Sequence, residues 1–91
     1  MYQIKKYSFD QAAKIGVIIK PSIHKNKKID VFDKNNKFIV SIGHIAYKDY
    51  PTYLLIDKKL AEERRKLYKI RHAKDKDIVG SAGYYADEIL W

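Results

Sequence analysis

IDVFDKNNKFIVSI, residues 29–42, has the clearest structural pattern in the chain. Apolar side chains alternate with others on both sides of residues 33–36, as they do in strands with one buried face. Residues 33–36 are Asp, Lys, Asn and Asn, whose short polar side chains favour a tight turn. The pattern predicts a β-hairpin with strands at about 28–32 and 37–42. Because a two-stranded ribbon is marginal in water, we expect a third strand at about 17–20, or a helix, to cover it.

Helical signals flank the predicted hairpin. Ser8 and Gln11 have the spacing of a capping box, which predicts a short helix from Ser8 to about Ile15, and Gly16 can end it. After the hairpin, Pro51 suits a first helical turn, and Asp57 can cap a longer helix that continues to about residue 74.

The long helix is unusually basic and has an irregular apolar side. Leu60, Leu67 and Tyr68 share one side of a helical wheel, with Ala61 and Ile70 at its margins.

Ser81 can cap a terminal helix whose apolar residues recur at the spacing of a core-facing stripe, namely Ala82, Tyr85, Ala86, Ile89 and Leu90.

These elements predict an α+β fold in one domain over residues 1–91. In this fold, a small antiparallel sheet packs against the long basic helix and the C-terminal helix. The chain has no Cys, so it contains neither a disulfide nor a thiolate metal site. No apolar run approaches the ~20 residues of a membrane span, and the first residues lack the apolar stretch of a secretory signal. We therefore expect an intracellular protein that is not secreted.

The formal net charge of +8 is concentrated in two segments. Residues 20–28 contain four lysines and no acid, and residues 58–76 contain nine bases against three acids. Neighbouring cations reinforce one another within a Debye length of ~8 Å at physiological salt. Clusters of this kind favour a polyanionic partner, most commonly nucleic acid and next an anionic membrane surface.

The candidate phosphate-binding residues come from both segments. They are Lys25, Lys27 and Lys28 before the hairpin, and Arg65, Lys66, Lys69 and His72 on the outward side of the long helix. The alternative is that Glu62 and Glu63 pair with Lys66 and Lys69 along the helix and that the rest keeps the protein in solution.

Arg64 and Arg71 fall inside the apolar side of the same helix, where a guanidinium needs a partner. One interpretation is a structural pair with Asp49, Asp87 or Glu88. The other is a groove in which both arginines meet a phosphate or bases. Tyrosines near the basic helix could stack on unpaired bases or simply pack: Tyr47, Tyr50, Tyr53, Tyr68, Tyr84 and Tyr85.

The sequence contains no recognisable catalytic arrangement. His24, His44 and His72 are far apart and lack metal-ligand spacing, and no Gly-rich phosphate loop precedes a helix. We therefore expect no enzymatic activity, no metal and no cofactor.

Three stretches together resemble a known group: IGHIAYKDYPTY (42–53), RRKLYKIRHAKD (64–75) and GSAGYYADEILW (80–91). The chain resembles small basic proteins of large DNA viruses of algae and protists, with more distant relatives in tailed phages, over roughly residues 28–91. The resemblance implies a viral setting, in the virion or in the host cytoplasm or nucleus, and no particular chemistry.

Two functional hypotheses follow. The first is a viral protein that binds nucleic acid, DNA in particular, through phosphate contacts with little sequence specificity. The second is a structural virion protein, a minor capsid or cement component, whose basic faces meet acidic surfaces of coat proteins.

Overall fold

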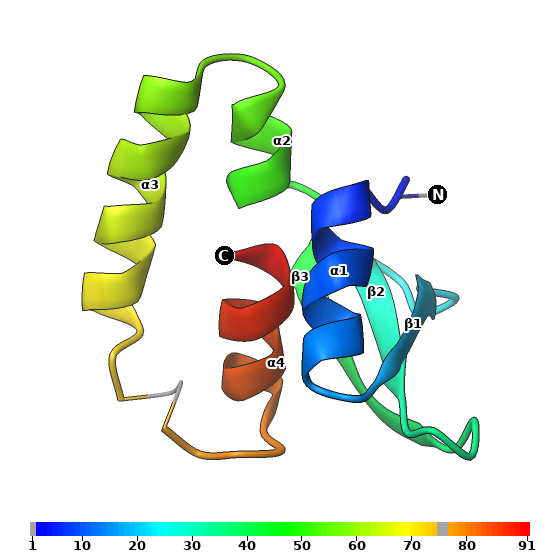
Figure 1. Cartoon of the computed structure of the whole chain (residues 1–91). Helices are drawn as coiled ribbons and strands as arrows, with labels where there is room; N and C mark the ends of the chain where they lie inside the picture. The colour runs from blue at the N-terminus through cyan, green and yellow to red at the C-terminus, as the bar shows by residue number, and fades with distance from the viewer. Residues whose placement is uncertain (1, 75–76) are drawn as a thin grey trace.

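The computed structural model describes residues 2–74 and 77–91. Its elements are, in chain order, α1 (Lys6–Lys14), β1 (Ile18–Pro21), β2 (Lys27–Phe32), β3 (Phe38–His44), α2 (Tyr50–Leu54), α3 (Lys58–Arg71) and α4 (Ala82–Leu90). Helices and a small antiparallel sheet make up the molecule (Figure 1). The predicted α+β class is confirmed. Of the helices in these ranges, none has both the length and the hydropathy that a bilayer crossing requires.

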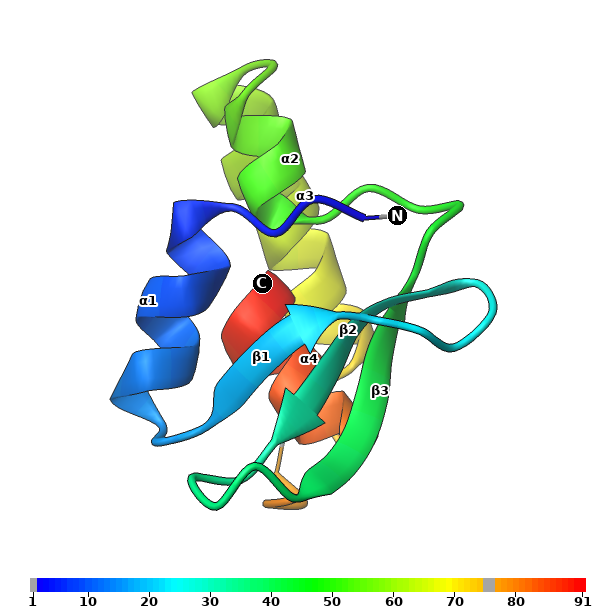
Figure 2. The same cartoon turned by 90° about the vertical axis from the view of Figure 1, so that its right-hand side faces the viewer.

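The sheet has the order β1-β2-β3, and both pairings are antiparallel (Figure 2). The predicted hairpin is confirmed, with Ile29 opposite Ile42 and Asn36 at a φ of 66° in the turn. The predicted third strand is β1, which places Ile19 opposite Val31. This register brings the large apolar side chains to one face.

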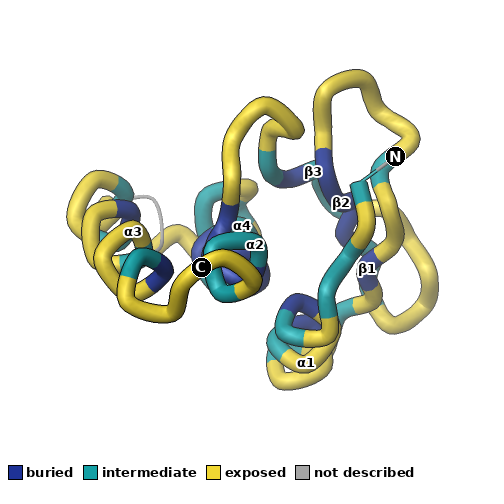
Figure 3. Tube along the Cα trace, turned by 90° about the horizontal axis from the view of Figure 1, so that it is seen from above, coloured by how far each residue is buried: buried dark blue, intermediate teal, exposed yellow. Residues whose placement is uncertain are grey.

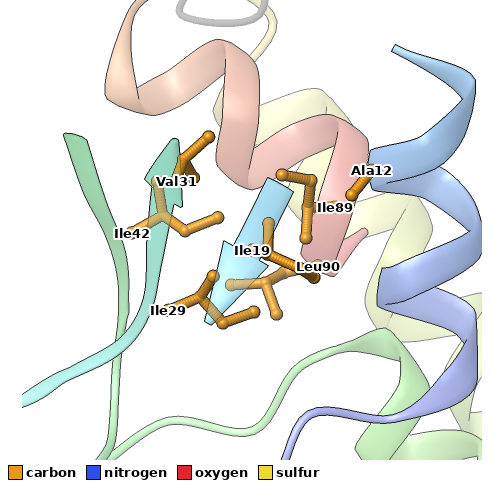
Figure 4. Close-up of a cluster of buried hydrophobic side chains, with 7 residues drawn as sticks. All are labelled: Ala12, Ile19, Ile29, Val31, Ile42, Ile89 and Leu90. Carbon is orange, nitrogen blue, oxygen red and sulfur yellow. The ribbon is translucent and has the colours of Figure 1, made fainter. Parts of the chain in front are cut away.

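Two helices, α1 and α4, pack on the sheet and on each other. The core between them and the strands is a single cluster (Figure 4) of Ala12, Ile19, Ile29, Val31, Ile42, Ile89 and Leu90. Most of these residues lie at positions that the strand alternation and the terminal-helix stripe predict to be buried.

The start of α1 differs from the prediction. The helix begins at Lys6, and Lys5 is its N-cap without a side-chain hydrogen bond. Ser8 instead lies buried within the helix and donates to the carbonyl of Ile89 at 2.9 Å, while Gln11 donates to the carbonyl of Glu88 at 3.2 Å. The last carbonyls of a helix lack partners of their own, so a long-range contact outweighs the local capping box.

The position of α3 also differs from the prediction that the long helix packs on the sheet. In Figures 1 and 3, α4 lies between α3 and the strands, and α3 packs mainly on α2. Only Ala61 and Tyr68 of α3 are buried, whereas Leu67 and Ile70 are exposed. The apolar side of α3 is therefore largely uncovered along one flank.

The predicted helix caps are confirmed for α3 and α4. The Asp57 carboxylate accepts from the Lys59 amide at 3.0 Å, and the Ser81 hydroxyl accepts from the Tyr84 amide at 3.1 Å. Pro51 lies in the first turn of α2, as predicted, and α2 is capped by Asp49. The Asp49 and Asp57 caps mark where α2 and α3 begin.

Candidate nucleic-acid interface

A groove of about 670 Å³ lies between α3, the C-terminal end of α4 and the open end of the β2–β3 hairpin, away from its turn. Its basic lining residues are Lys27, Lys28, Lys48, Arg64 and Arg71. Its imidazole and aromatic lining residues are His44, Tyr47, Tyr53, Tyr68, His72 and Trp91. Among the described residues that line it, none is acidic. The groove is within the size range of small-ligand sites, roughly 300–1,000 Å³.

Arg64 and Arg71 form the α3 wall of this groove, two helical turns apart. Both are exposed, and neither makes a salt bridge to another described residue. The guanidinium of Arg64 lies 5.9 Å from the ring centroid of Tyr53. The structure thus differs from the interpretation of a structural pair with Asp49, Asp87 or Glu88. No salt bridge joins either arginine to one of these described carboxylates, and lysines occupy Asp49 and Asp87.

The floor of the groove is a stack of rings. Tyr68 lies between His72 and Trp91, with ring centroids 4.3 Å away on each side. The Tyr68 and Trp91 planes differ by only 6°, and Tyr53 approaches Trp91 at 6.4 Å. Stacked and offset ring pairs add roughly 0.5–1.5 kcal/mol beyond their buried area. The stack therefore helps to hold α3 beside the end of α4.

The opposite wall comes from the hairpin and the loop that follows it. Lys27 and His44 are partners in the β2–β3 register, which places both at the end of the hairpin. The His44 Nδ1 accepts from the Ala46 amide at 3.0 Å and so shapes the loop. Tyr47 lies 5.5 Å from His44 and is 73% exposed, and Lys48 next to it is exposed too.

Lys28 has a structural role that removes it from the predicted phosphate contacts. Its ammonium lies 2.8 Å from Asp49 Oδ2, and the two side chains are only 4% and 1% exposed. Asp49 also accepts from the Tyr2 hydroxyl at 2.6 Å and the Thr52 amide at 3.0 Å. Burial would raise the pKa of Asp49, but hydrogen bonds from Lys28, Thr52 and Tyr2 lower it. The carboxylate stays charged and holds Lys28 in place.

Arg65, Lys66 and Lys69 lie on the other side of α3, around a separate hollow. The Arg65 guanidinium lies 4.8 Å from the ring centroid of Tyr50. The Lys69 ammonium lies 2.9 Å from Asp87 Oδ1 and donates to the Asp87 carbonyl at 3.3 Å. Two of the three predicted phosphate ligands are therefore already engaged within the protein.

The other predicted positions divide in the same way. Lys27 and His72 line the groove, whereas Lys25 is exposed in the loop before β2 and does not line it. The alternative that Glu62 and Glu63 pair with Lys66 and Lys69 also differs from the structure, because no salt bridge joins these described residues. Glu62 instead accepts from the Tyr50 hydroxyl at 2.7 Å. The predicted positions that line the groove are thus Lys27 and the ion-paired Lys28 from the first basic segment, and Arg64, Arg71 and His72 from α3 and its end.

Sequence reasoning missed Lys48 as a member of the site. This lysine lies in a stretch without a charge cluster, so no local signal selects it. Tyr47 belongs to the predicted aromatic set, but nothing in the sequence distinguishes it from the buried Tyr50 three residues later. Only the path of the loop brings both beside Arg64 and Arg71.

A second polar cluster lies on the sheet face opposite the core. Buried Asp30 accepts from the hydroxyls of Ser22 and Ser41 and lies 3.0 Å from His24 Nδ1. Burial would raise the pKa of Asp30, but hydrogen bonds from Ser22, Ser41, His24 and the Ile23 amide lower it to about 2. The cluster fastens the loop between β1 and β2 to the sheet. In the described part of the chain, no three His, Asp or Glu side chains are grouped to hold a metal ion.

Comparison with protein-family models, curated proteins and solved structures finds no match to this chain. The fold and the groove are therefore the basis for any functional statement.

Proposed function

We propose that this protein binds nucleic acid, DNA in particular, through phosphate contacts in the groove between α3 and the end of the hairpin, with little sequence specificity. The observation that carries the proposal is the charge of the lining: the basic side chains come from α3, the hairpin and the loop, and no described lining residue is acidic. Four of these cations, on Lys27, Lys48, Arg64 and Arg71, make no salt bridge to a described residue.

Charge complementarity favours a polyanion over a small anion. The four cations are distributed over both walls, so a chain of phosphates can contact several of them at once. Arginine also suits phosphate because its planar fork donates two parallel hydrogen bonds. Contacts of this kind position a nucleic acid without reading its bases, which is the reason for the expected low specificity.

The test is an electrophoretic mobility shift series across salt concentrations. If four phosphates are neutralised, the slope of log affinity against log salt should be about −4 for duplex DNA, at roughly −0.9 per phosphate, and about −3 for a single strand, at roughly −0.7 per phosphate. Replacing Arg64 and Arg71 with Gln should reduce the magnitude of this slope by about 2 and weaken binding at every salt concentration.

The matched control is the double variant Lys34→Gln with Lys66→Gln, which removes the same charge outside the groove. Lys34 is in the β2–β3 turn and Lys66 faces the separate hollow on α3. Equal losses in the two double variants would show that net charge, not the groove, binds DNA. A protein that ignores DNA at low salt would refute the proposal.

The second candidate is a structural virion protein, and one observation favours it. The α2–α3 hairpin exposes large apolar side chains that a protein partner could cover, among them Leu55, Ile56 and Ile70. Co-sedimentation with capsid material together with no retention on DNA resin would support this role over the first.

A further inference from the structure

We propose that the groove takes a single, unpaired strand, with a base packed against Tyr47 and the strand's phosphates on the surrounding cations. This inference rests on the proposed function and names the form of nucleic acid that the groove fits. It concerns residues of the β3–α2 loop that the charge pattern of the sequence does not select.

The site is concave, which suits a single strand better than a duplex. The cations of the groove lie on two facing walls, Lys27 and Lys48 on one and Arg64 and Arg71 on the other. A duplex presents phosphates on the outside of a wide cylinder and keeps the faces of its bases stacked inside. A single strand can enter a groove lined on both sides and expose its base faces to side chains, and proteins that bind single strands combine a basic groove with aromatic rings.

Apolar surface is exposed inside the groove. Tyr47 is 73% exposed, and Leu67 on the facing α3 wall is 57% exposed. The other tyrosines of the groove are covered to a greater degree: Tyr68 is buried beneath Trp91, and Tyr53 is partly buried. An exposed ring within a basic groove is costly to hydrate and available to a flat partner, which a nucleobase supplies.

Positive charge surrounds the Tyr47 ring. Lys48 follows Tyr47 directly, and Lys27 lies at the hairpin end beside it. If a base packs on Tyr47, Lys48 and Lys27 are thus placed to contact a phosphate of the same nucleotide. Arg64 and Arg71 on α3 would be available for neighbouring phosphates. The order of ring and cations matches a strand that crosses from the loop to α3.

The experiment compares a short oligothymidylate, the corresponding oligouridylate, their duplexes with the complementary strands, and inorganic polyphosphate. Trp91 is the only tryptophan of the chain and lines the groove, so its fluorescence reports occupancy. We expect both single strands to change Trp91 emission and to bind more tightly than the duplexes or polyphosphate at the same salt.

Three variants isolate the ring. Tyr47→Ala should weaken single-strand binding by about 5- to 150-fold, the range that corresponds to ~1–3 kcal/mol of base stacking, and leave polyphosphate binding unchanged. Tyr47→Phe should retain most of the affinity. The matched control is Ile45→Ala, in the same loop but outside the groove lining, which should bind like the unaltered protein. Because Tyr47 and Ile45 are exposed, neither change should alter the unfolding midpoint.

The outcomes separate this inference from the proposed function. Equal affinity for single strand, duplex and polyphosphate, with no effect of Tyr47→Ala, would overturn the single-strand inference. If the Arg64 and Arg71 double variant then lost its binding to nucleic acid, the proposed function would still stand. Absence of salt-sensitive binding to every polynucleotide would overturn both.

Discussion

Replacement of Gly43 by Ala should destabilise the protein more than the same change at Gly16 or Gly80. Gly43 lies in β3 at a φ of 75°, where an L-residue is strained by roughly 1–2 kcal/mol. A Cβ there would lie 2.8 Å from Leu90 Cδ1 and 2.9 Å from Lys28 Cδ. Contacts this short require one of the neighbours to move.

Neither neighbour can move freely. Leu90 is buried in the core beneath the sheet, and Lys28 is held by its ion pair with Asp49. Overpacking in such a site typically costs about 1–3 kcal/mol, so the total for Gly43→Ala should be about 2–5 kcal/mol. That is a large share of the ~5–15 kcal/mol by which domains are stable.

The structure supplies a matched control in Gly16. Its φ is 73°, almost the same as that of Gly43, and nothing lies within 4 Å of the Cβ that an alanine would add. Gly16→Ala should therefore lower the free energy of unfolding only through backbone strain, by roughly 1–2 kcal/mol. Urea denaturation at fixed temperature measures both losses, and the midpoint should fall further for Gly43→Ala with an unchanged slope. Equal losses would refute the close packing of β3 against Leu90 and Lys28.

Two further predictions concern buried charges. Lys28→Met should lower the free energy of unfolding by about 3–5 kcal/mol, because it leaves the Asp49 carboxylate buried without its cation. The control is Lys6→Met, which breaks an exposed pair with Asp10 and should lower the free energy of unfolding by under about 1 kcal/mol in the same urea assay. Similar costs would contradict the buried pair. The pKa of Asp30 is about 2 in the folded protein and roughly 3.9 in an unfolded chain, so its stabilisation is present above pH ~4 and is lost as the pH falls towards 2. Relative to Asp30→Asn, the protein should lose about 2 kcal/mol between pH 5 and pH 2, and a pH-independent difference between the two proteins would contradict the hydrogen-bonded carboxylate.

Local signals account for most of the secondary structure. The alternation in residues 29–42 and the turn at Asn36 predict the hairpin, because a strand pattern and a turn act within a few residues. Asp57 and Ser81 mark helix starts for the same reason, since a cap bonds an amide two or three residues away. Ser8 shows the limit: the same chemistry is present, but the carbonyl of Ile89, 81 residues away in the chain, accepts from its hydroxyl.

The candidate site depends on longer-range information. The sequence indicates that cations cluster in two segments, but not which of them are neutralised. Lys28 and Lys69 each meet a buried carboxylate, on Asp49 and Asp87, that lies about twenty residues away in the chain. By contrast, Arg64 and Arg71 make no salt bridge to a described residue, and both line the groove.

The strands, the turn, most helix ends and the excess of positive charge can be predicted from the sequence, because each of these depends on neighbouring residues or on composition alone. The tertiary structure decided that α4, not α3, covers the sheet. It also decided that Lys48 and Tyr47 face the arginines of α3 across a groove. The physical reason is that burial and ion pairing join residues distant in the chain, and the packing of the whole core selects which of many possible partners meet.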